Sequence, residues 1–319
     1  MATAAADDPL TRISRAQERR CLEKKRHRAR AAAKSASTSS SSSAAFCSQA
    51  WMLGRPSCAA AAFATPRLRQ CPFDLAAIDW QRSARMACGV DGHLWKVWFK
   101  GSGPYVLKVF WDTSSAATRY FAAKRECQNA ALLQMMQAAV EASMSESAPP
   151  ICVNPCPKTR GEARENTLAF SEEGRRGELA GQAAAADGGT TTMQITSVPR
   201  LRKCYGWAKV HGHTLWNTWP ATMRPRALRL KKFTRSFSDT QEYLAIVYEY
   251  VEEAENDAAA VERAADFFWR AGFGYTLSSA ERNWKSGVLV DLSDIVHASS
   301  RHWNEKGYGT RSAARILRP

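Results

Sequence analysis

The fold is decided by a strand-like run with one charge in it, Tyr105-Val106-Leu107-Lys108-Val109-Phe110-Trp111. A lysine among apolar strand residues is costly to bury unless its ammonium meets an anion. Glu126 follows in the segment Thr118–Met144, which lacks Pro and Gly and has apolar residues near helical spacing. We therefore expect Lys108 on a buried strand to pair with Glu126 on the next helix. The alternative is an edge lysine lying along apolar surface and a solvated glutamate.

A second short apolar run, His93–Phe99, precedes this stretch, and Gly101-Ser102-Gly103-Pro104 separates the two, which predicts a β-hairpin. Gly89 and Gly92 lie just before it. Glycines at such a position let backbone amides approach a phosphate, because no Cβ intervenes. Ala87 occupies the place of the first glycine in the three-glycine loop of protein kinases. Two glycines near a strand are also typical of an ordinary turn.

Four further elements follow along the chain. Arg200–Val210 and Tyr243–Tyr250 have the composition of strands, Ala258–Trp269 that of a helix, and Trp284–Asp291 that of a hairpin turning at Ser286-Gly287. Hairpin, long helix, two strands, helix and hairpin is the element order of a bilobal protein-kinase-like fold. Many α+β folds share this order, so it does not decide function.

The polar residues of this region stand at positions that carry chemistry in kinases. Tyr248 and Val251 fall where a hinge strand contacts a nucleotide, and Asn283 and Asp291 fall where the two metal-binding residues lie. Ser278 stands five residues before Asn283, where kinases have the aspartate that accepts the substrate proton. A neutral hydroxyl cannot act as that base at pH 7. Asn283 and Asp291 are alternatively a turn residue and a strand-end cap.

These motifs together resemble a fungal kinetochore-subunit family, the Fta-two type of the Sim-four complex, which is similar to protein kinases. The likeness lies in Gly89–Gly92, Tyr105–Trp111, Arg125–Cys127 and Asn283–Ser293, and it covers roughly Pro72 to His297. The resemblance implies a kinase-like fold, ATP and Mg²⁺ as ligands, and kinetochore subunits as partners. The implied nucleotide contacts are Gly89, Gly92, Lys108, Glu126, Tyr248 and Val251, and the implied metal ligands are Asn283 and Asp291.

Several departures from active kinases predict a binding module rather than an enzyme. Ser278 replaces the catalytic aspartate, and the glycine loop is incomplete. After Asp291 the sequence has 28 residues, which leaves no room for an activation loop or an Ala-Pro-Glu anchor. We therefore expect a nuclear pseudoenzyme that acts as a binding or scaffold module, with or without nucleotide binding. An atypical ATP-dependent phosphotransferase is the alternative, since phosphoryl transfer depends largely on positioning and electrostatics.

The charge of the chain is concentrated at its N-terminus. The net charge is +15, and residues 1–70 carry 13 Lys and Arg against 4 Asp and Glu. Ser35–Ser43 is nearly pure Ser, Thr and Ala, which predicts a disordered basic arm. The cluster Arg19–Arg30 suits nuclear import or contact with nucleic-acid phosphates, or is simply a solvated arm. Leucine heptads do not follow it, which argues against a basic-region DNA reader. Arg224–Arg235 forms a second basic patch.

The predicted organisation is an α+β fold with flexible additions. We expect a disordered arm over 1–70, a kinase-like domain over 71–298 and a tail over 299–319. Within the domain, a small lobe spans 71–251 and contains an insertion at about 145–192, and a minimal large lobe spans 252–298. The nine cysteines without a secretory signal favour a reducing compartment, either the nucleus or the cytoplasm. A run of eighteen apolar residues is absent, so we expect no membrane association.

Overall fold

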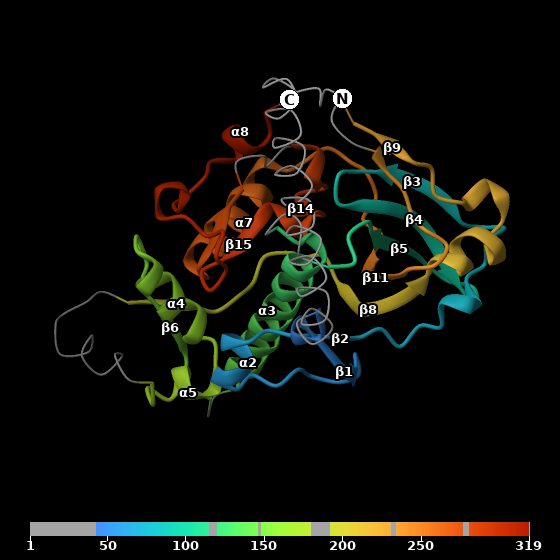
Figure 1. Cartoon of the computed structure of the whole chain (residues 1–319). Coiled ribbons are helices and arrows are strands. Elements are labelled where there is room, and N and C mark those ends of the chain that lie inside the picture. Colours follow the sequence, from blue (N-terminus) through green and yellow to red (C-terminus); the bar gives the residue numbers. More distant parts are fainter. Residues whose placement is uncertain are drawn as a thin grey trace, which may run out of the picture. The chain divides into compact units, whose positions relative to one another are not determined.

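A seven-stranded sheet with a long helix packed against it positions the candidate site (Figure 1). The computed structural model describes residues 43–114, 120–145, 148–179, 192–230, 234–276 and 281–318. Segments 46–113 and 120–319 belong to one unit. Its strands and α-helices are β1 Cys47–Trp51, α2 Ala60–Ala64, β2 Leu68–Gln70, β3 Ala84–Cys88, β4 Gly92–Phe99, β5 Ser102–Phe110, α3 Ala122–Ser143, β6 Ile151–Val153, α4 Arg160–Leu168, α5 Glu172–Arg175, β7 Met193–Ile195, β8 Cys204–His211, β9 Leu228–Arg229, β10 Thr234–Arg235, β11 Glu242–Glu249, α7 Ala258–Arg270, β12 Phe273–Tyr275, β13 Trp284–Lys285, β14 Val288–Leu289, β15 Ile295–His297 and α8 Ala313–Ile316. Short helical turns are η1 Ser43–Phe46, η2 Leu75–Ala77, η3 Thr214–Thr218, η4 Ala221–Met223, η5 Glu281–Asn283, η6 Leu292–Asp294 and η7 Glu305–Gly307.

The strand order of the large sheet is β1-β2-β8-β11-β5-β4-β3. Strands β1, β2 and β8 pair in parallel, and the remaining pairs are antiparallel. Strand β5 lies between β4 and β11, so Lys108 stands in register with Leu94 on one side and Ile246 on the other. A central strand with apolar neighbours on both sides places this lysine in the interior of the sheet.

Helix α3 is buried on more than one side. Fourteen of its 22 residues are buried, because the helix packs on β2, β8 and β11 and also on η6 and β15. A helix that is apolar around most of its circumference is typical of a core position. The helix predicted over 118–144 is confirmed over Ala122–Ser143, and residues 118 and 119 lie outside the described part of the chain. The helix joins the sheet to the elements that follow β11 (Figure 1).

Both predicted hairpins are present, and each turns on two residues. Lys100 and Gly101 have φ angles of 45° and 83°, and Ser286 and Gly287 have φ angles of 51° and 74°. Two successive positive φ angles are the signature of the tight turn that suits the twist of antiparallel strands. The first turn lies two residues earlier than the sequence indicated, because Ser102 already belongs to β5. The second lies at the predicted Ser286-Gly287.

The predicted arm over 1–70 extends too far into the fold. Strands β1 and β2 lengthen the sheet beyond β8, and Phe46, Phe63 and Leu68 are buried. The Trp207 indole donates a hydrogen bond to the Ser48 carbonyl at 2.8 Å. The segment is rich in Ala and Ser, so its few apolar anchors were hidden by composition. The arm over 1–42, including Arg19–Arg30, lies outside the described residues.

Two other predicted irregular segments also contain regular structure. The described parts of the insertion at about 145–192 hold β6, α4 and α5, with β7 directly after it, and Thr159 and Glu162 form a capping box at the start of α4. This Thr-x-x-Glu signal was readable in the sequence and was missed. The predicted tail over 299–319 holds α8, which contacts α7 and buries Ile316, and it also buries Trp303. These segments are integral parts of the unit.

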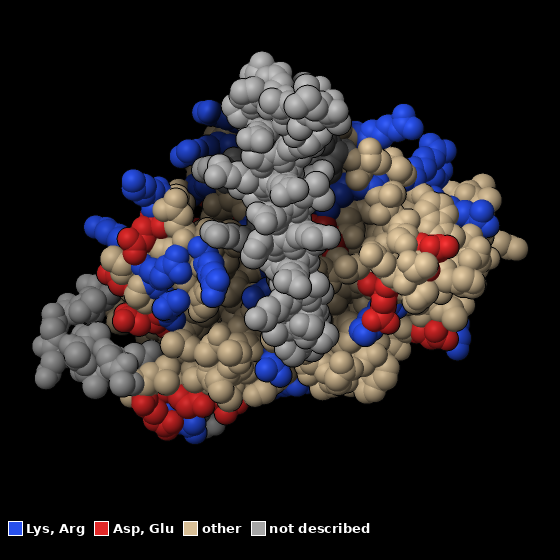
Figure 2. Space-filling model, in the orientation of Figure 1, with Lys and Arg blue, Asp and Glu red and all other residues tan. Residues whose placement is uncertain are grey.

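Charged side chains are unevenly spread over the described surface. In the view of Figure 2, Lys and Arg gather near β9 and α8, and Asp and Glu gather near α5. Within the predicted basic patch, Arg224, Arg226 and Arg229 are exposed, whereas Arg235 pairs with Asp112. Among the described helices, none is both long enough and apolar enough to cross a membrane.

Candidate functional site

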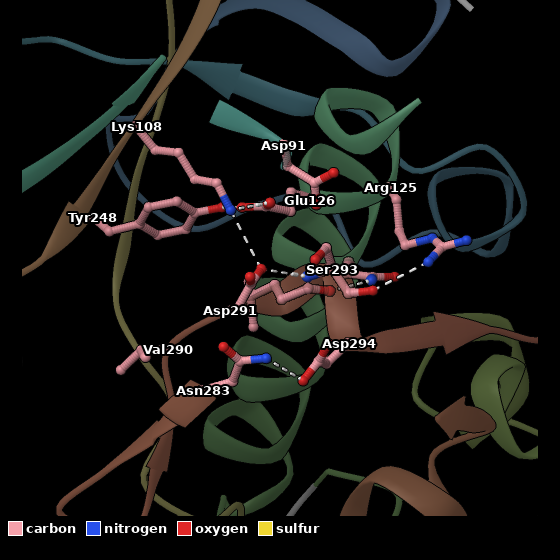
Figure 3. A network of polar contacts seen from close by, with 12 residues as sticks. Asp91, Lys108, Arg125, Glu126, Tyr248, Asn283, Val290, Asp291, Ser293 and Asp294 are labelled. Atoms are coloured by element: carbon pink, nitrogen blue, oxygen red, sulfur yellow. Dashed lines mark hydrogen bonds and ion pairs between the residues drawn. The ribbon is translucent and has the colours of Figure 1, made fainter. Parts of the chain in front are cut away.

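The centre of the site is an ion-paired lysine. The Lys108 ammonium lies 2.5 Å from Glu126 Oε1 and 3.3 Å from Asp291 Oδ1 (Figure 3). Burial opposes the charge on Lys108, but Asp291 and Glu126 outweigh burial and raise its pKa above the usual value. The predicted pair of Lys108 with Glu126 is therefore confirmed, and Asp291 joins it from a segment 183 residues away.

Glu126 is held in place from two sides. Its second carboxylate oxygen accepts a hydrogen bond from the Tyr248 hydroxyl at 2.9 Å. Burial raises the pKa of Glu126 to about 7, and the Lys108 charge limits that rise. One ammonium thus faces two carboxyl groups. The centre is close to neutral or slightly negative at pH 7, so an anion gains little there unless a further cation accompanies it.

Asp291 begins a tight turn that fixes its carboxylate. Its Oδ1 accepts from the Ser293 amide at 3.1 Å as well as from Lys108. Burial raises the pKa of Asp291, but Lys108 and the Ser293 hydrogen bonds outweigh this and hold the pKa below its usual value. Asn129 on α3 supports the turn, because its amide donates to the Leu292 and Ile295 carbonyls, each at 2.8 Å.

Asn283 contacts this turn at Asp294 rather than at Asp291. Its amide nitrogen donates to Asp294 Oδ2 at 2.6 Å. Asn283 and Asp291 both line the same cleft, with an amide and a carboxylate group facing one region (Figure 3). Within the described residues, no group of three or more His, Cys, Asp or Glu side chains is placed to hold a metal ion. Mg²⁺, however, is commonly bound by one or two carboxylates together with substrate phosphates. The side-chain oxygen atoms of Asp291 and Asn283 fit this mode of Mg²⁺ binding.

The glycines before β4 have different roles. A Cβ on Gly92 would lie 2.4 Å from the Val109 carbonyl oxygen, so β4 and β5 require glycine there to approach each other. Gly89 stands in the turn between β3 and β4, and its carbonyl accepts from the Trp111 indole at 2.8 Å. Both glycines line the cleft. The close approach of β4 and β5 is therefore sufficient to explain why residue 92 is a glycine, independently of any phosphate bound at this turn.

Arg202 is a site residue that sequence reasoning missed. Its guanidinium donates to the Glu249 carbonyl at 3.1 Å and to the Val290 carbonyl, and it stacks over the Tyr248 ring at 4.4 Å. It is buried, and burial lowers its pKa. Arg202 thus ties the end of β11 to the residue before Asp291. The partners are 47 and 88 residues away, so no local pattern indicated them.

A cleft of about 1240 Å³ runs across these residues. Its lining includes six of the predicted site residues: Gly89, Gly92, Lys108, Val251, Asn283 and Asp291. Glu126 and Tyr248 are buried behind Lys108 and position it. Ser278 lies outside the described residues. Further lining comes from side chains that the sequence did not single out: Tyr120, Arg125, Arg202 and His302.

Comparison with family models, with curated proteins and with solved structures finds no match for this chain. The geometry of the cleft is therefore the basis for a functional assignment.

Proposed function

We propose that the chain is a kinase-like pseudoenzyme whose cleft binds a nucleotide with Mg²⁺. The observation that supports this is the triad of Lys108, Glu126 and Asp291. In protein kinases a strand lysine pairs with a glutamate of the next helix, and an aspartate holds the metal. The same residue types stand here on β5, on α3 and two residues after the end of β14.

The roles of the residues follow from their contacts. Lys108 would meet the nucleotide phosphates, with Glu126 and Tyr248 fixing its position. The Asp291 carboxylate and the side-chain amide oxygen of Asn283 would hold Mg²⁺. The metal ion would supply the positive charge that the centre of the site lacks. The Val251 backbone and the neighbouring Tyr250 would contact the base. Transfer to a protein substrate is not expected, because Ser278 stands in place of the usual proton acceptor.

A thermal-shift titration with ATP and Mg²⁺ tests nucleotide binding. Saturating ligand stabilises a protein by about 2.7 kcal/mol at one hundred times its Kd. We expect this shift in the wild type and in Lys209→Met, a control lysine exposed on β8 of the same sheet. Lys108→Met/Glu126→Gln should lose the shift, since it removes the ammonium without stranding a buried carboxylate. A shift that survives in the double variant would overturn the proposal.

The second candidate function is an atypical phosphotransferase, and the volume of the cleft is the observation that supports it. General-base help contributes about 10²–10⁴-fold, so a missing aspartate alone need not abolish turnover. ATP consumption by the wild type, Lys108→Met/Glu126→Gln and Asp291→Asn separates the two functions. ATP turnover that the wild type shows and both variants lose would mean that the chain is an enzyme rather than a pseudoenzyme. Equal background signals from all three support a binding role.

The resemblance to the fungal kinetochore family leads us to propose a nuclear scaffold with kinetochore subunits as partners. Fluorescent tagging of the full chain tests this location. Foci that coincide with a centromere marker support it, and uniform cytoplasmic signal contradicts it. A tagged chain lacking 1–42 shows whether the basic cluster Arg19–Arg30 directs import.

A weak nucleic-acid interaction through Arg19–Arg30 is a further proposal. Contacts with phosphates release counterions, so affinity should fall steeply with salt and differ little between duplex sequences. Fluorescence anisotropy at two salt concentrations measures this. A strong preference for one duplex would contradict it.

A further inference from the structure

Three arginines lie at the surface on one short stretch of chain between η4 and β10. Arg224, Arg226 and Arg229 are exposed, whereas Pro225 is buried and Leu228 packs against the apolar core. The two apolar side chains anchor the stretch, and the three arginines are left to face solvent.

The stretch is attached to the large sheet and to its own hairpin. The Trp95 indole on β4 donates to the Met223 carbonyl at 2.8 Å, and the Arg85 guanidinium on β3 donates to the Arg224 carbonyl at 3.5 Å. The other end of the stretch forms β9, which pairs with β10. A backbone that is fixed in this way lets its side chains bind a partner with a smaller loss of freedom.

Arg85 adds a fourth positive charge to the same surface. It stands opposite Trp95 in the register of β3 and β4, so both side chains lie on one face of the sheet. Leu94 precedes Trp95 and points to the other face, where it lines the cleft together with Lys108. A ligand in the cleft therefore leaves this surface accessible, and Figure 2 shows Lys and Arg gathered near β9. We use the name basic face for four residues: Arg85, Arg224, Arg226 and Arg229.

Acidic side chains do not neutralise the basic face. The sequence from 213 to 238 contains no Asp or Glu. Among the ion pairs that the described residues form, none involves an arginine of the basic face. In contrast, the nearby Arg235 pairs with Asp112, and Lys209 pairs with Glu242. Like charges held near one another repel, so a bound polyanion would relieve this repulsion.

The composition of the basic face favours nucleic acid over protein. Protein interfaces usually have a core of apolar and aromatic side chains. Among the described residues, the exposed large apolar side chains are Trp51, Leu53, Met86, Val90 and Met144, and the two near β3, Met86 and Val90, line the cleft. The basic face thus has no apolar anchor of its own. Contacts with phosphate require charge and N–H donors, and the arginine fork supplies both.

We propose that the basic face binds the phosphate backbone of a nucleic-acid duplex. Its four arginines come from β3, from β9 and from the stretch before β9, so each can contact a different phosphate. Phosphate contacts carry no sequence information by themselves, and we therefore expect similar affinity for different duplexes. The inference is independent of the nucleotide proposed for the cleft and of the cluster Arg19–Arg30.

Fluorescence anisotropy of the full chain with a labelled DNA duplex, between about 50 and 200 mM salt, tests the basic face. Arg224→Gln/Arg226→Gln/Arg229→Gln removes three phosphate contacts, so the slope of log affinity against log salt should become shallower by about 2.7. A fourfold rise in salt should then weaken the wild type about 40-fold more than it weakens this variant. Arg55→Gln/Arg67→Gln/Lys158→Gln, the matched control, removes the same charge at exposed positions outside the basic face and should keep the wild-type slope.

Two results for the duplex would overturn the inference. One is an equal slope for the wild type and the basic-face variant. The other is an equal reduction by the two triple variants, which would show that net charge alone controls binding. A labelled poly-glutamate peptide tests for an acidic protein partner. If the basic-face variant weakens peptide binding as much as duplex binding, the surface does not select nucleic acid and the proposal is wrong.

A third variant of the full chain, Arg19→Gln/Arg20→Gln/Arg30→Gln, separates the basic face from the N-terminal cluster. Loss of duplex binding in this variant alone would assign the interaction to the cluster and overturn the inference. Loss in the basic-face variant alone supports the inference and would contradict the proposal for the cluster. Partial losses in both variants support two separate contacts with the duplex.

Discussion

The centre of the cleft and the first turn of α3 differ in the charges that surround them. At the centre, Lys108 is buried and shared by Glu126 and Asp291. At the first turn of α3, Lys124 is exposed, and the charges acting on His297 and His302 are all positive. The first arrangement is stabilising only when complete, and under the proposed function a metal ion accompanies the phosphate there. The second consists of exposed side chains, so it costs little stability to alter. Stability and binding should therefore respond differently to changes in the two regions.

The largest effect should come from breaking the central pair. Lys108→Met leaves the Glu126 carboxyl buried without its partner, which typically costs about 3–5 kcal/mol. Lys108→Met/Glu126→Gln should recover a large part of this loss, because the stranded charge is gone. Urea unfolding of the two single variants and the double variant measures the coupling. Additive losses would show that the pair is not coupled.

The turn that carries Asp291 should be the next most sensitive element. Asn129→Leu removes the donor to the Leu292 and Ile295 carbonyls inside the core. Leaving buried acceptors unsatisfied costs about 1–3 kcal/mol. Gln137→Leu, on the exposed side of the same helix, is the control and should change the free energy of unfolding far less. Equal losses for both variants would contradict a supporting role for Asn129.

Acid should destabilise the protein through buried histidines. The pKa of His297 is lowered to about 4, so the folded state binds fewer protons than the unfolded state between pH 4 and 6.5. Its contribution is complete above pH 6.5 and is lost as the pH falls, by about 2 kcal/mol at pH 5. Urea unfolding at pH 7 and pH 5 should show a smaller difference in His297→Gln. If the difference in stability between pH 7 and pH 5 is the same in His297→Gln as in the wild type, residues other than His297 cause the acid sensitivity.

The smallest effect is expected from an exposed ion pair that lines the cleft. Lys285 pairs with Glu253 at 3.1 Å, but the Glu253 side chain is 82% exposed. Surface pairs of this kind contribute about 0–1 kcal/mol. Lys285→Ala should therefore leave the melting temperature nearly unchanged. A loss comparable with that of Asn129→Leu would show that exposed charges of the cleft also support the fold.

The same contrast explains what the sequence could predict. Lys108 and Glu126 were identifiable, because a charge in an apolar strand requires a partner and the next helix supplied one. Asn283 and Asp291 were identifiable from their spacing around a hairpin. Arg202, Asn129 and His302 act on backbone groups or rings far along the chain, so no periodicity marks them. Strands β1 and β2 were missed because their segment is rich in Ala and Ser, which hides the few buried apolar residues, such as Leu68, that anchor it.

Under the proposed function, the cleft binds a nucleotide through Lys108 and a metal ion at Asp291. Isothermal titration calorimetry with ATP, in Mg²⁺ and in EDTA, tests it most directly. We predict that tight binding requires Mg²⁺ and is lost in Asp291→Asn, because two carboxyl groups face one ammonium at the centre. Equal affinity in EDTA, or full affinity in Asp291→Asn, would contradict the account.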